Sequence, residues 1–257
     1  HIVRAFHNDD IVHVNDLVDP KSDIEIINTE LILADIQTIE TRLPKVIKES
    51  KAIPASRAAA EYLQSLLTHL NAGTPLSSLP DLNLEQIADL HLLTAKPVIY
   101  AFNVDEKTLV DDSKKAELSA LVAPARTIFV CAQLEDEIKG LPQADAQELL
   151  ESYGVKETGL AQMVHAAYDI LGLQSYLTAG QQEIRAWTIK KGATAPQAAG
   201  VIHGDFERGF IAAAIVDYDD LIVAGSETAA KAAGKMRTEG KEYIMRPGDI
   251  VEFRFNV

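Results

Sequence analysis

The sequence has a single cysteine and no hydrophobic run long enough to cross a membrane. A membrane helix needs roughly 18 consecutive apolar residues, whereas the longest uncharged apolar stretches here, such as Phe210–Val216, have the length of a strand. Because Cys131 stands alone, an internal disulfide is excluded, and one free thiol suits a reducing compartment. The first residues show no secretory signal. These absences predict a cytoplasmic protein with no membrane segment.

Basic residues are also scarce. The chain has 24 Lys+Arg against 38 Asp+Glu, a net charge of −14, which argues against coating nucleic acid by bulk electrostatics and gives no sign of DNA specificity. The acidity is uneven, since the stretch from Gln174 onward has 10 basic and 11 acidic residues, leaving 14 basic and 27 acidic residues for the first 173. A near-neutral C-terminal region permits local contact with RNA.

Two apolar stripes with helical spacing come early in the chain. Asn28 is a favourable N-cap, and the residue pair Asp19-Pro20 is expected to interrupt regular structure before it. A break at Ser50–Ser56 separates the stripes, and Gly73 ends the second one. Two such helices joined by a short turn predict an antiparallel helical hairpin over residues 28–74; the alternative that the stripes serve only as core stays open. The stripes consist of Ile32, Ile36, Ile39, Leu43 and Val46, then Ala59, Leu63, Leu66, Leu67 and Leu70.

The pattern then changes to short apolar runs. After a predicted helix from Asn83 through Leu93, Val98–Phe102 and Thr127–Ala132 are uninterrupted runs with helix-compatible sequence between them. Such runs predict parallel strands buried on both faces in an α/β fold. Ligands bind at the carboxyl ends of such strands, where the polar segments Asn103–Glu106 and Gln133–Glu135 stand.

Beyond Gly172 the alternation of short strands and helices predicts a small α+β fold of the ubiquitin-like, β-grasp type. The expected strands are Gln174–Ala179, Glu183–Thr188, Phe210–Val216, Tyr243–Met245 and Ile250–Phe255, and the expected helices are Pro196–Val201 and Ser226–Lys235.

The segment Asn103-Val104-Asp105-Glu106 stands where GTPases of the P-loop class carry Asn-Lys-x-Asp, whose aspartate accepts two hydrogen bonds from guanine. Here Val104 replaces the lysine and Glu106 the aspartate. The longer carboxylate cannot take the same position unless the loop moves. This variation resembles the YchF branch of Obg-like ATPases, which prefers ATP to GTP.

Further segments resemble the same family, in the family's order. They are His1–Phe6 with Asn8–Val14, Asp23–Leu31, the loop Cys131–Glu135, and the C-terminal Ile202–Ile211 and Arg246–Phe253. The last two resemble TGS domains, which also occur in threonyl-tRNA synthetases and stringent-response enzymes. The resemblance runs essentially from end to end.

The resemblance implies a partial P-loop nucleotide-binding domain at 1–27 and 75–172, a helical insertion at 28–74 and a TGS domain at 173–257. It implies binding and hydrolysis of ATP, with GTP weaker, and action near the ribosome, with RNA contact through the TGS domain and the hairpin. The base pocket would use Asn103, Val104, Glu106, Ala132 and Gln133. His13 would orient the attacking water.

No G-x-x-x-x-G-K-[ST] motif occurs in the sequence, so backbone N–H groups that cradle phosphates and a hydroxyl for Mg²⁺ are lacking. Mg²⁺ would be held by a missing N-terminal segment, and no metal ligands are predicted in this chain. Since the sequence opens without methionine inside a predicted strand, we expect a truncated chain that does not hydrolyse ATP alone. Two alternatives stay open, a nucleotide-independent ribosome- or RNA-binding module and a fragment of another TGS enzyme such as a synthetase.

Overall fold

A computed structural model describes residues 1–8, 18–51, 53, 55–180 and 183–256. The chain forms two units, His1–Ala166 and Ala167–Val257, and each is described by itself. Among the described residues, no helix is both long enough and apolar enough to span a bilayer.

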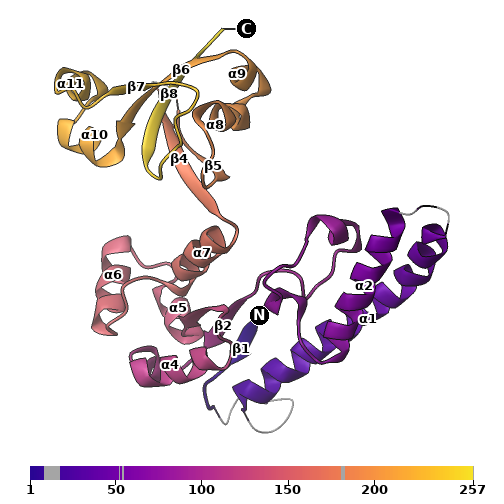
Figure 1. The fold of residues 1–257 in the computed structure, drawn as a ribbon. Helices are drawn as coiled ribbons and strands as arrows, with labels where there is room; N and C mark the ends of the chain where they lie inside the picture. Colours follow the sequence, from indigo (N-terminus) through magenta and orange to yellow (C-terminus); the bar gives the residue numbers. More distant parts are fainter. Residues whose placement is uncertain (9–17, 52, 54, 181–182, 257) are drawn as a thin grey trace. The chain divides into compact units, whose positions relative to one another are not determined.

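The first unit is built on a parallel sheet with the strand order β1-β2-β3 (Figure 1). Its strands are β1 (Ile2–Arg4), β2 (Ile99–Asn103) and β3 (Arg126–Val130). Alternate residues face opposite sides: Phe102 belongs to one buried cluster, and Ala101 packs with Ile128 and Ala166 in another. Both faces are therefore buried, and the predicted α/β fold with a parallel sheet is confirmed.

Short helices follow the strands. Thr108 and Leu109 of the first helix after β2 are buried, whereas the helix after it has no buried residue. The last helix lays Ala166 on the sheet. These helices are α3 (Glu106–Leu109), α4 (Asp112–Ala120), α5 (Ala132–Ile138), α6 (Gln143–Ser152) and α7 (Gly159–Ile170).

Helix α1 (Pro20–Ser50) begins eight residues before the predicted cap at Asn28. The Asp19 side chain is the actual cap, because it accepts hydrogen bonds from the backbone N–H groups of Lys21 at 3.1 Å and Ser22 at 3.2 Å. The pair Asp19-Pro20 therefore marks the boundary at which the helix begins, and the predicted cap at Asn28 was wrong. Proline at the first helical position loses no hydrogen bond, and its fixed φ suits the helix.

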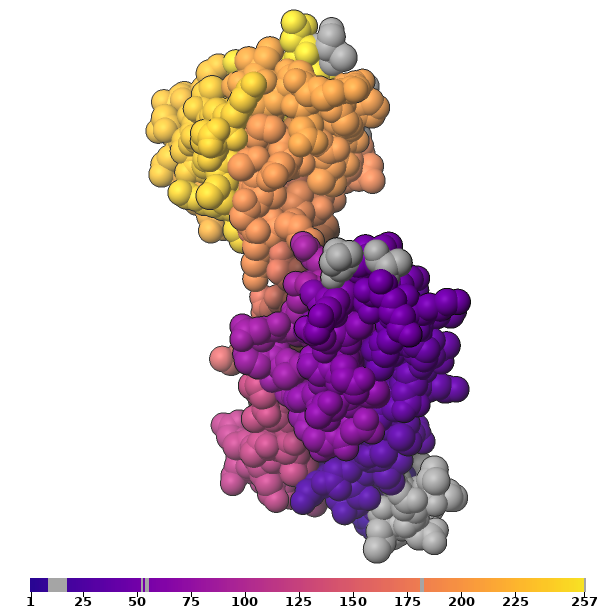
Figure 2. All heavy atoms as spheres, turned by 45° about the vertical axis from the view of Figure 1, so that its right-hand side comes forward, coloured from indigo at the N-terminus to yellow at the C-terminus, as the bar shows by residue number. Residues whose placement is uncertain are grey.

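Helices α1 and α2 (Ala55–Asn71) pack side by side (Figure 1). Their contact uses the two predicted apolar stripes except at Ala59, which is exposed, and Ala60 packs there instead. The Asp35 carboxylate holds the segment that follows α2. Asp35 is 1% exposed and accepts hydrogen bonds from the backbone N–H groups of Leu93 and Thr94, each at 2.7 Å. In Figure 2 the segment between α2 and β2 forms a continuous surface beside these helices.

The α-helix predicted from Asn83 to Leu93 is a 3₁₀ helix instead. The segment between α2 and β2 contains two such helices, η1 (Leu76–Ser78) and η2 (Glu85–Leu90). The Tyr62 hydroxyl accepts the Asn83 N–H at 2.8 Å, and Asp35 binds beyond the other end. Side chains of the long helices therefore hold the chain on both sides of η2. The whole segment between α2 and β2 contributes Leu76, Ile87 and Leu92 to their core.

The second unit is a five-stranded sheet with the order β5-β4-β8-β6-β7. Strands β4 and β8 pair in parallel, and the other neighbours are antiparallel. One face buries Tyr176 and Ile215 against α8, and the other carries Val216 and Ile250 under Ala230 of α11. The strands are β4 (Leu173–Ala179), β5 (Ile184–Lys190), β6 (Phe210–Asp217), β7 (Arg237–Glu239) and β8 (Asp249–Phe255), and the helices are α8 (Ala195–Ile202), α9 (Gly204–Arg208), α10 (Tyr218–Ala224) and α11 (Glu227–Ala232).

Two predicted elements of this unit were wrong. Tyr243–Met245 is not a strand of the sheet, because its backbone bonds to the loop before α8: the Ala195 N–H donates to the Tyr243 carbonyl at 2.8 Å, and the Met245 N–H to that of Ala193 at 3.0 Å. The strand in that region is β7, three residues long and too polar to show an apolar pattern. The helix predicted to Lys235 ends at Ala232, before Gly234 at a φ of +69°.

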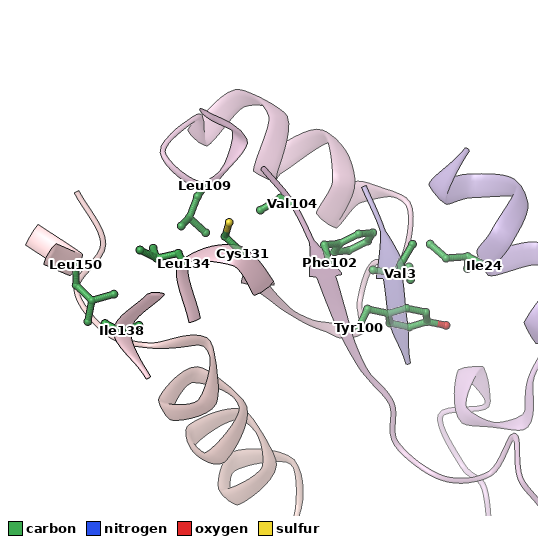
Figure 3. Close-up of a cluster of buried hydrophobic side chains, with 11 residues drawn as sticks. Val3, Ile24, Tyr100, Phe102, Val104, Leu109, Cys131, Leu134, Ile138 and Leu150 are labelled. Carbon is green, nitrogen blue, oxygen red and sulfur yellow. The ribbon is translucent and has the colours of Figure 1, made fainter. Parts of the chain in front are cut away.

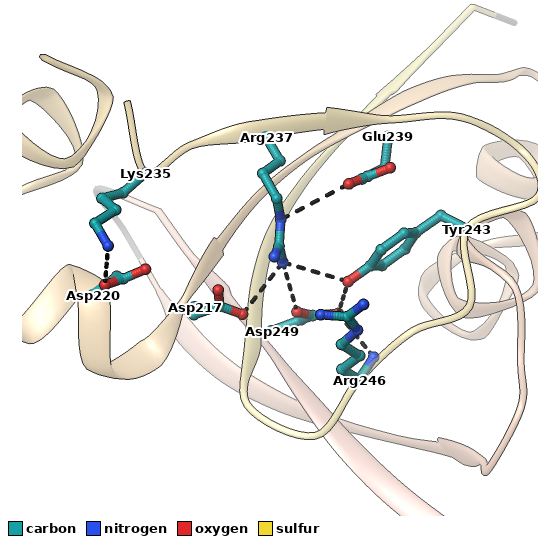
Figure 4. A network of polar contacts seen from close by, with 8 residues as sticks. All are labelled: Asp217, Asp220, Lys235, Arg237, Glu239, Tyr243, Arg246 and Asp249. Atoms are coloured by element: carbon teal, nitrogen blue, oxygen red, sulfur yellow. Dashed lines mark hydrogen bonds and ion pairs between the residues drawn. The ribbon is translucent and has the colours of Figure 1, made fainter. Parts of the chain in front are cut away.

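A polar network centred on Asp249 lies between β6, β7 and β8 (Figure 4). Asp249 is fully buried, and its Oδ2 accepts hydrogen bonds from the Arg246 N–H at 2.8 Å and the Tyr243 hydroxyl at 3.0 Å. Its Oδ1 lies 3.6 Å from Nη2 of Arg237, which also bonds Asp217 at 3.2 Å. Burial, together with the Asp249 charge, raises the pKa of Tyr243 to about 12. The phenol therefore stays protonated and can donate to the carboxylate.

Candidate functional site

Two loops meet at the carboxyl edge of the parallel sheet. Asn103 ends β2, and its Oδ1 accepts a hydrogen bond from the backbone N–H of Ala132 at 3.2 Å. The N–H of Val104 donates to the carbonyl of Val130, the last residue of β3, at 2.9 Å. The segments that start at Asn103 and at Cys131 are thus held side by side, at the edge where parallel sheets bind ligands.

The side chain of Val104 points into the protein, as Figure 3 shows. It is 2% exposed and belongs to a cluster with Phe102, Leu109 and Cys131. Val104 therefore fixes the loop from inside, through its buried side chain and its N–H bond to Val130. A lysine here would place an ammonium group among apolar side chains, at a high cost in free energy.

Glu106 is the first residue of α3 and is half-buried. The turn before it is fixed by Asp105, whose Oδ1 accepts the Thr108 N–H at 2.8 Å; hydrogen bonds from Thr108 hold the pKa of Asp105 below its usual value. The charge of Glu106 is the main reason why the pKa of Tyr153 is raised. The Glu106 side chain thus stands in the first turn of this helix, on the same side as Tyr153.

Ala132 and Gln133 open α5 and are both exposed. The Gln133 amide donates to the Glu137 carboxylate at 3.2 Å. The residue before them, Cys131, is 4% exposed and lies in the core beside Val104 (Figure 3). The structure thus brings Asn103, Val104 and Ala132 together, because the Asn103 side chain bonds Ala132 and the Val104 N–H bonds Val130. Gln133 and Glu106 each lie in the first turn of a neighbouring helix.

His13, the predicted water-orienting residue, lies outside the described residues. Within the described ranges, no group of three or more His, Cys, Asp or Glu side chains converges as a metal site. The described residues therefore do not fit a Mg²⁺ site, and no step of the function is assigned to a metal held by them.

Sequence reasoning missed a contact behind these loops. The Glu135 carboxylate accepts the backbone N–H of Gly159, the first residue of α7, at 2.6 Å. A signal was present in the sequence, because glycine is a poor helix former and often marks a close approach of backbone to a neighbour.

Comparison with known proteins gives consistent matches. Residues 173–256 match the family model YchF-GTPase_C, described as a protein of unknown function (DUF933). The "Ribosome-binding ATPase YchF" of Bacillus subtilis is 46% identical over 265 residues, which cover 100% of this chain and 72% of that protein. The protein of the same name from Escherichia coli O157:H7 is 43% identical over 263 residues, with the same coverage.

A solved structure also matches. The structure of the Schizosaccharomyces pombe YchF GTPase superposes with a TM-score of 0.82 at 34% sequence identity, covering 98% of this chain and 71% of that one. The likeness in sequence and in fold therefore extends over nearly all of the chain.

Proposed function

The chain belongs to the YchF family, and we propose from this that it is the base-binding part of a ribosome-binding ATPase that prefers ATP to GTP. The observation that carries the proposal is the bond from Ala132 N–H to Asn103 Oδ1. It joins the two loops that would enclose a purine, in a chain 46% identical to a ribosome-binding ATPase. The family assignment sets aside the alternative of a synthetase fragment.

Each residue of the site has a distinct role in this proposal. Asn103 holds the two loops together, and Ala132 and Gln133 form the exposed backbone against which the base lies. Val104 anchors the first loop to the second through its buried side chain and its N–H bond to Val130. Glu106 determines the choice of base: guanine presents two adjacent donors to a short aspartate, and the longer glutamate on α3 does not reproduce that geometry.

Competitive binding tests the proposal. In a form of the protein that includes a phosphate-binding loop, we expect ATP to displace a fluorescent ATP analogue about ten times more effectively than GTP, a difference of roughly 1.4 kcal/mol. Inorganic tripolyphosphate, which has no base, should compete far more weakly than ATP. Equal competition by ATP and tripolyphosphate would mean that the two loops do not read a base, and would end the proposal.

By resemblance, His13 orients the attacking water, and the same preparation tests this role. His13→Ala is expected to lower turnover roughly tenfold with ATP affinity unchanged, since a group that acts on the water contributes mainly in the transition state. Lower affinity at unchanged turnover would contradict it.

The second unit would be a β-grasp TGS domain beginning near residue 173. Its strand order and the parallel pairing of β4 with β8 support this assignment. Residues 28–74 would be the helical insertion, and residues 1–27 and 75–172 the partial nucleotide-binding domain. We place the protein in the cytoplasm, with the ribosome as its partner and RNA contact through the TGS domain and the helical insertion.

Co-sedimentation with ribosomal subunits distinguishes an ATPase from a nucleotide-independent docking module. We expect binding to change at least severalfold between ATP-bound and nucleotide-free protein, and to fall when Gln174–Val257 is removed. Equal binding in both nucleotide states would favour the docking module. An absence of binding by every form would contradict the ribosomal partner.

A further inference from the structure

The loop that follows β3 is tied to helix α7 by a single carboxylate. Glu135 lies one turn into α5, and its Oε1 accepts the backbone N–H of Gly159 at 2.6 Å. The Glu135 N–H in turn donates to the Cys131 carbonyl at 3.0 Å. Because the first N–H groups of a helix lack partners within the helix, this carboxylate satisfies one of them and binds α5 to the start of α7.

Gly159 lets α7 approach the end of β3 closely. A Cβ atom built on Gly159 would lie 2.6 Å from Cγ1 and 2.7 Å from Cγ2 of Val130, far inside van der Waals contact. Further along α7, Ala166 and Met163 pack against Ala101 and Ile128 of the sheet. The helix therefore lies directly on β3, with no room for a side chain at its first residue.

Val130 connects this packing to the candidate site. Its carbonyl accepts the Val104 N–H at 2.9 Å, and two residues later the Ala132 N–H donates to Asn103. Val130 thus touches Gly159 with its side chain and holds Val104 with its backbone. A shift of α7 by a few tenths of an ångström would move the residues from Val130 to Ala132, on which both loop contacts depend.

We propose that Glu135 is a positioning residue for base binding: its bond to Gly159 clamps α7 onto β3 and so fixes the two loops at the spacing a purine requires. The inference rests on the proposed function. Glu135 itself contacts no nucleotide in this proposal. Its substitution should therefore weaken binding of the base and leave binding of the phosphates unchanged.

Glu135→Ala and Glu135→Gln, in a form that includes a phosphate-binding loop, test this role. Loss of a charge-assisted hydrogen bond is expected to weaken ATP binding about fivefold with tripolyphosphate affinity unchanged. Gln keeps an acceptor oxygen and should stay within about twofold of wild type. Asp136→Ala, which removes an exposed carboxylate from the same helix, is the matched control and should change neither affinity.

A second experiment uses the close approach of Gly159 to the Val130 side chain. Gly159→Ala should weaken ATP binding in the same selective way, and Val130→Ala added to it should restore part of the loss, because it removes the two carbon atoms nearest the new methyl group. Gly204→Ala, with no atom within 4 Å of the added carbon, is the control.

Three outcomes would overturn the inference: unchanged ATP affinity in Glu135→Ala, an equal loss of ATP and tripolyphosphate affinity, or no rescue by Val130→Ala. Failure of the proposed base-binding function can be distinguished from failure of this inference. In that case the wild-type protein itself would bind ATP and tripolyphosphate with equal affinity.

Discussion

Replacing Asp249 with alanine is expected to lower the free energy of unfolding of the Ala167–Val257 unit by about 3 kcal/mol, the scale for removing one partner of a buried charged pair. Asp249 is fully buried and binds the Arg246 N–H and the Tyr243 hydroxyl. Arg237 lies 3.6 Å from its other oxygen. The substitution therefore leaves two hydrogen-bond donors without their acceptor and removes the buried carboxylate beside the Arg237 guanidinium.

Denaturant unfolding followed by tryptophan fluorescence measures this loss. Trp187 is the one tryptophan of the chain and lies in β5, so its emission reports on this unit. Asp249→Asn, which keeps one acceptor oxygen, should lose less. Glu252→Ala, in the same strand but exposed, should stay within about 0.5 kcal/mol of wild type. If Asp249→Ala were as stable as Glu252→Ala, the network would not stabilise the unit.

The second large effect concerns the choice of base. Glu106→Asp is expected to shift the ratio of ATP to GTP dissociation constants about 30-fold toward GTP, equivalent to about 2 kcal/mol, the range of hydrogen bonds to a charged group. The shorter carboxylate would recover the position from which aspartate accepts the two guanine donors. Val104 is left unchanged, because lysine there would enter the core.

Glu117→Asp makes the same chemical change at an exposed position of α4 and should leave the ratio unaltered. Competition of ATP and GTP against one fluorescent nucleotide gives both constants in a single preparation. If Glu106→Asp behaved like Glu117→Asp, Glu106 would not determine base choice, and discrimination would have to come from the loop backbone.

The strongly apolar parts of the fold could be predicted from the sequence. The runs before Asn103 and Cys131 gave β2 and β3, because strands covered on both faces need apolar residues at every position. Elements fixed by polar contacts could not be found in this way. Strand β7 has the sequence Arg-Thr-Glu, and the backbone on both sides of η2 donates hydrogen bonds to side chains of the long helices.

Part of the candidate site could likewise be predicted from the sequence, and part could not. Asn103 and Ala132 stand at predicted strand ends, so their proximity follows from the parallel arrangement. The inward direction of the Val104 side chain and the bond from Gly159 to Glu135, 24 residues apart, arise only when the helices pack on the sheet. No local pattern encodes them.

The burial of Cys131 has a practical consequence. The only sulfhydryl of the chain lies beneath the junction of the two loops and is 4% exposed, so an alkylating reagent can reach it only after that edge opens. The modification rate, read from the mass of the intact polypeptide, therefore measures how often the edge opens, without any engineered probe. A bound purine that bridges the loops would protect the sulfur and slow the reaction.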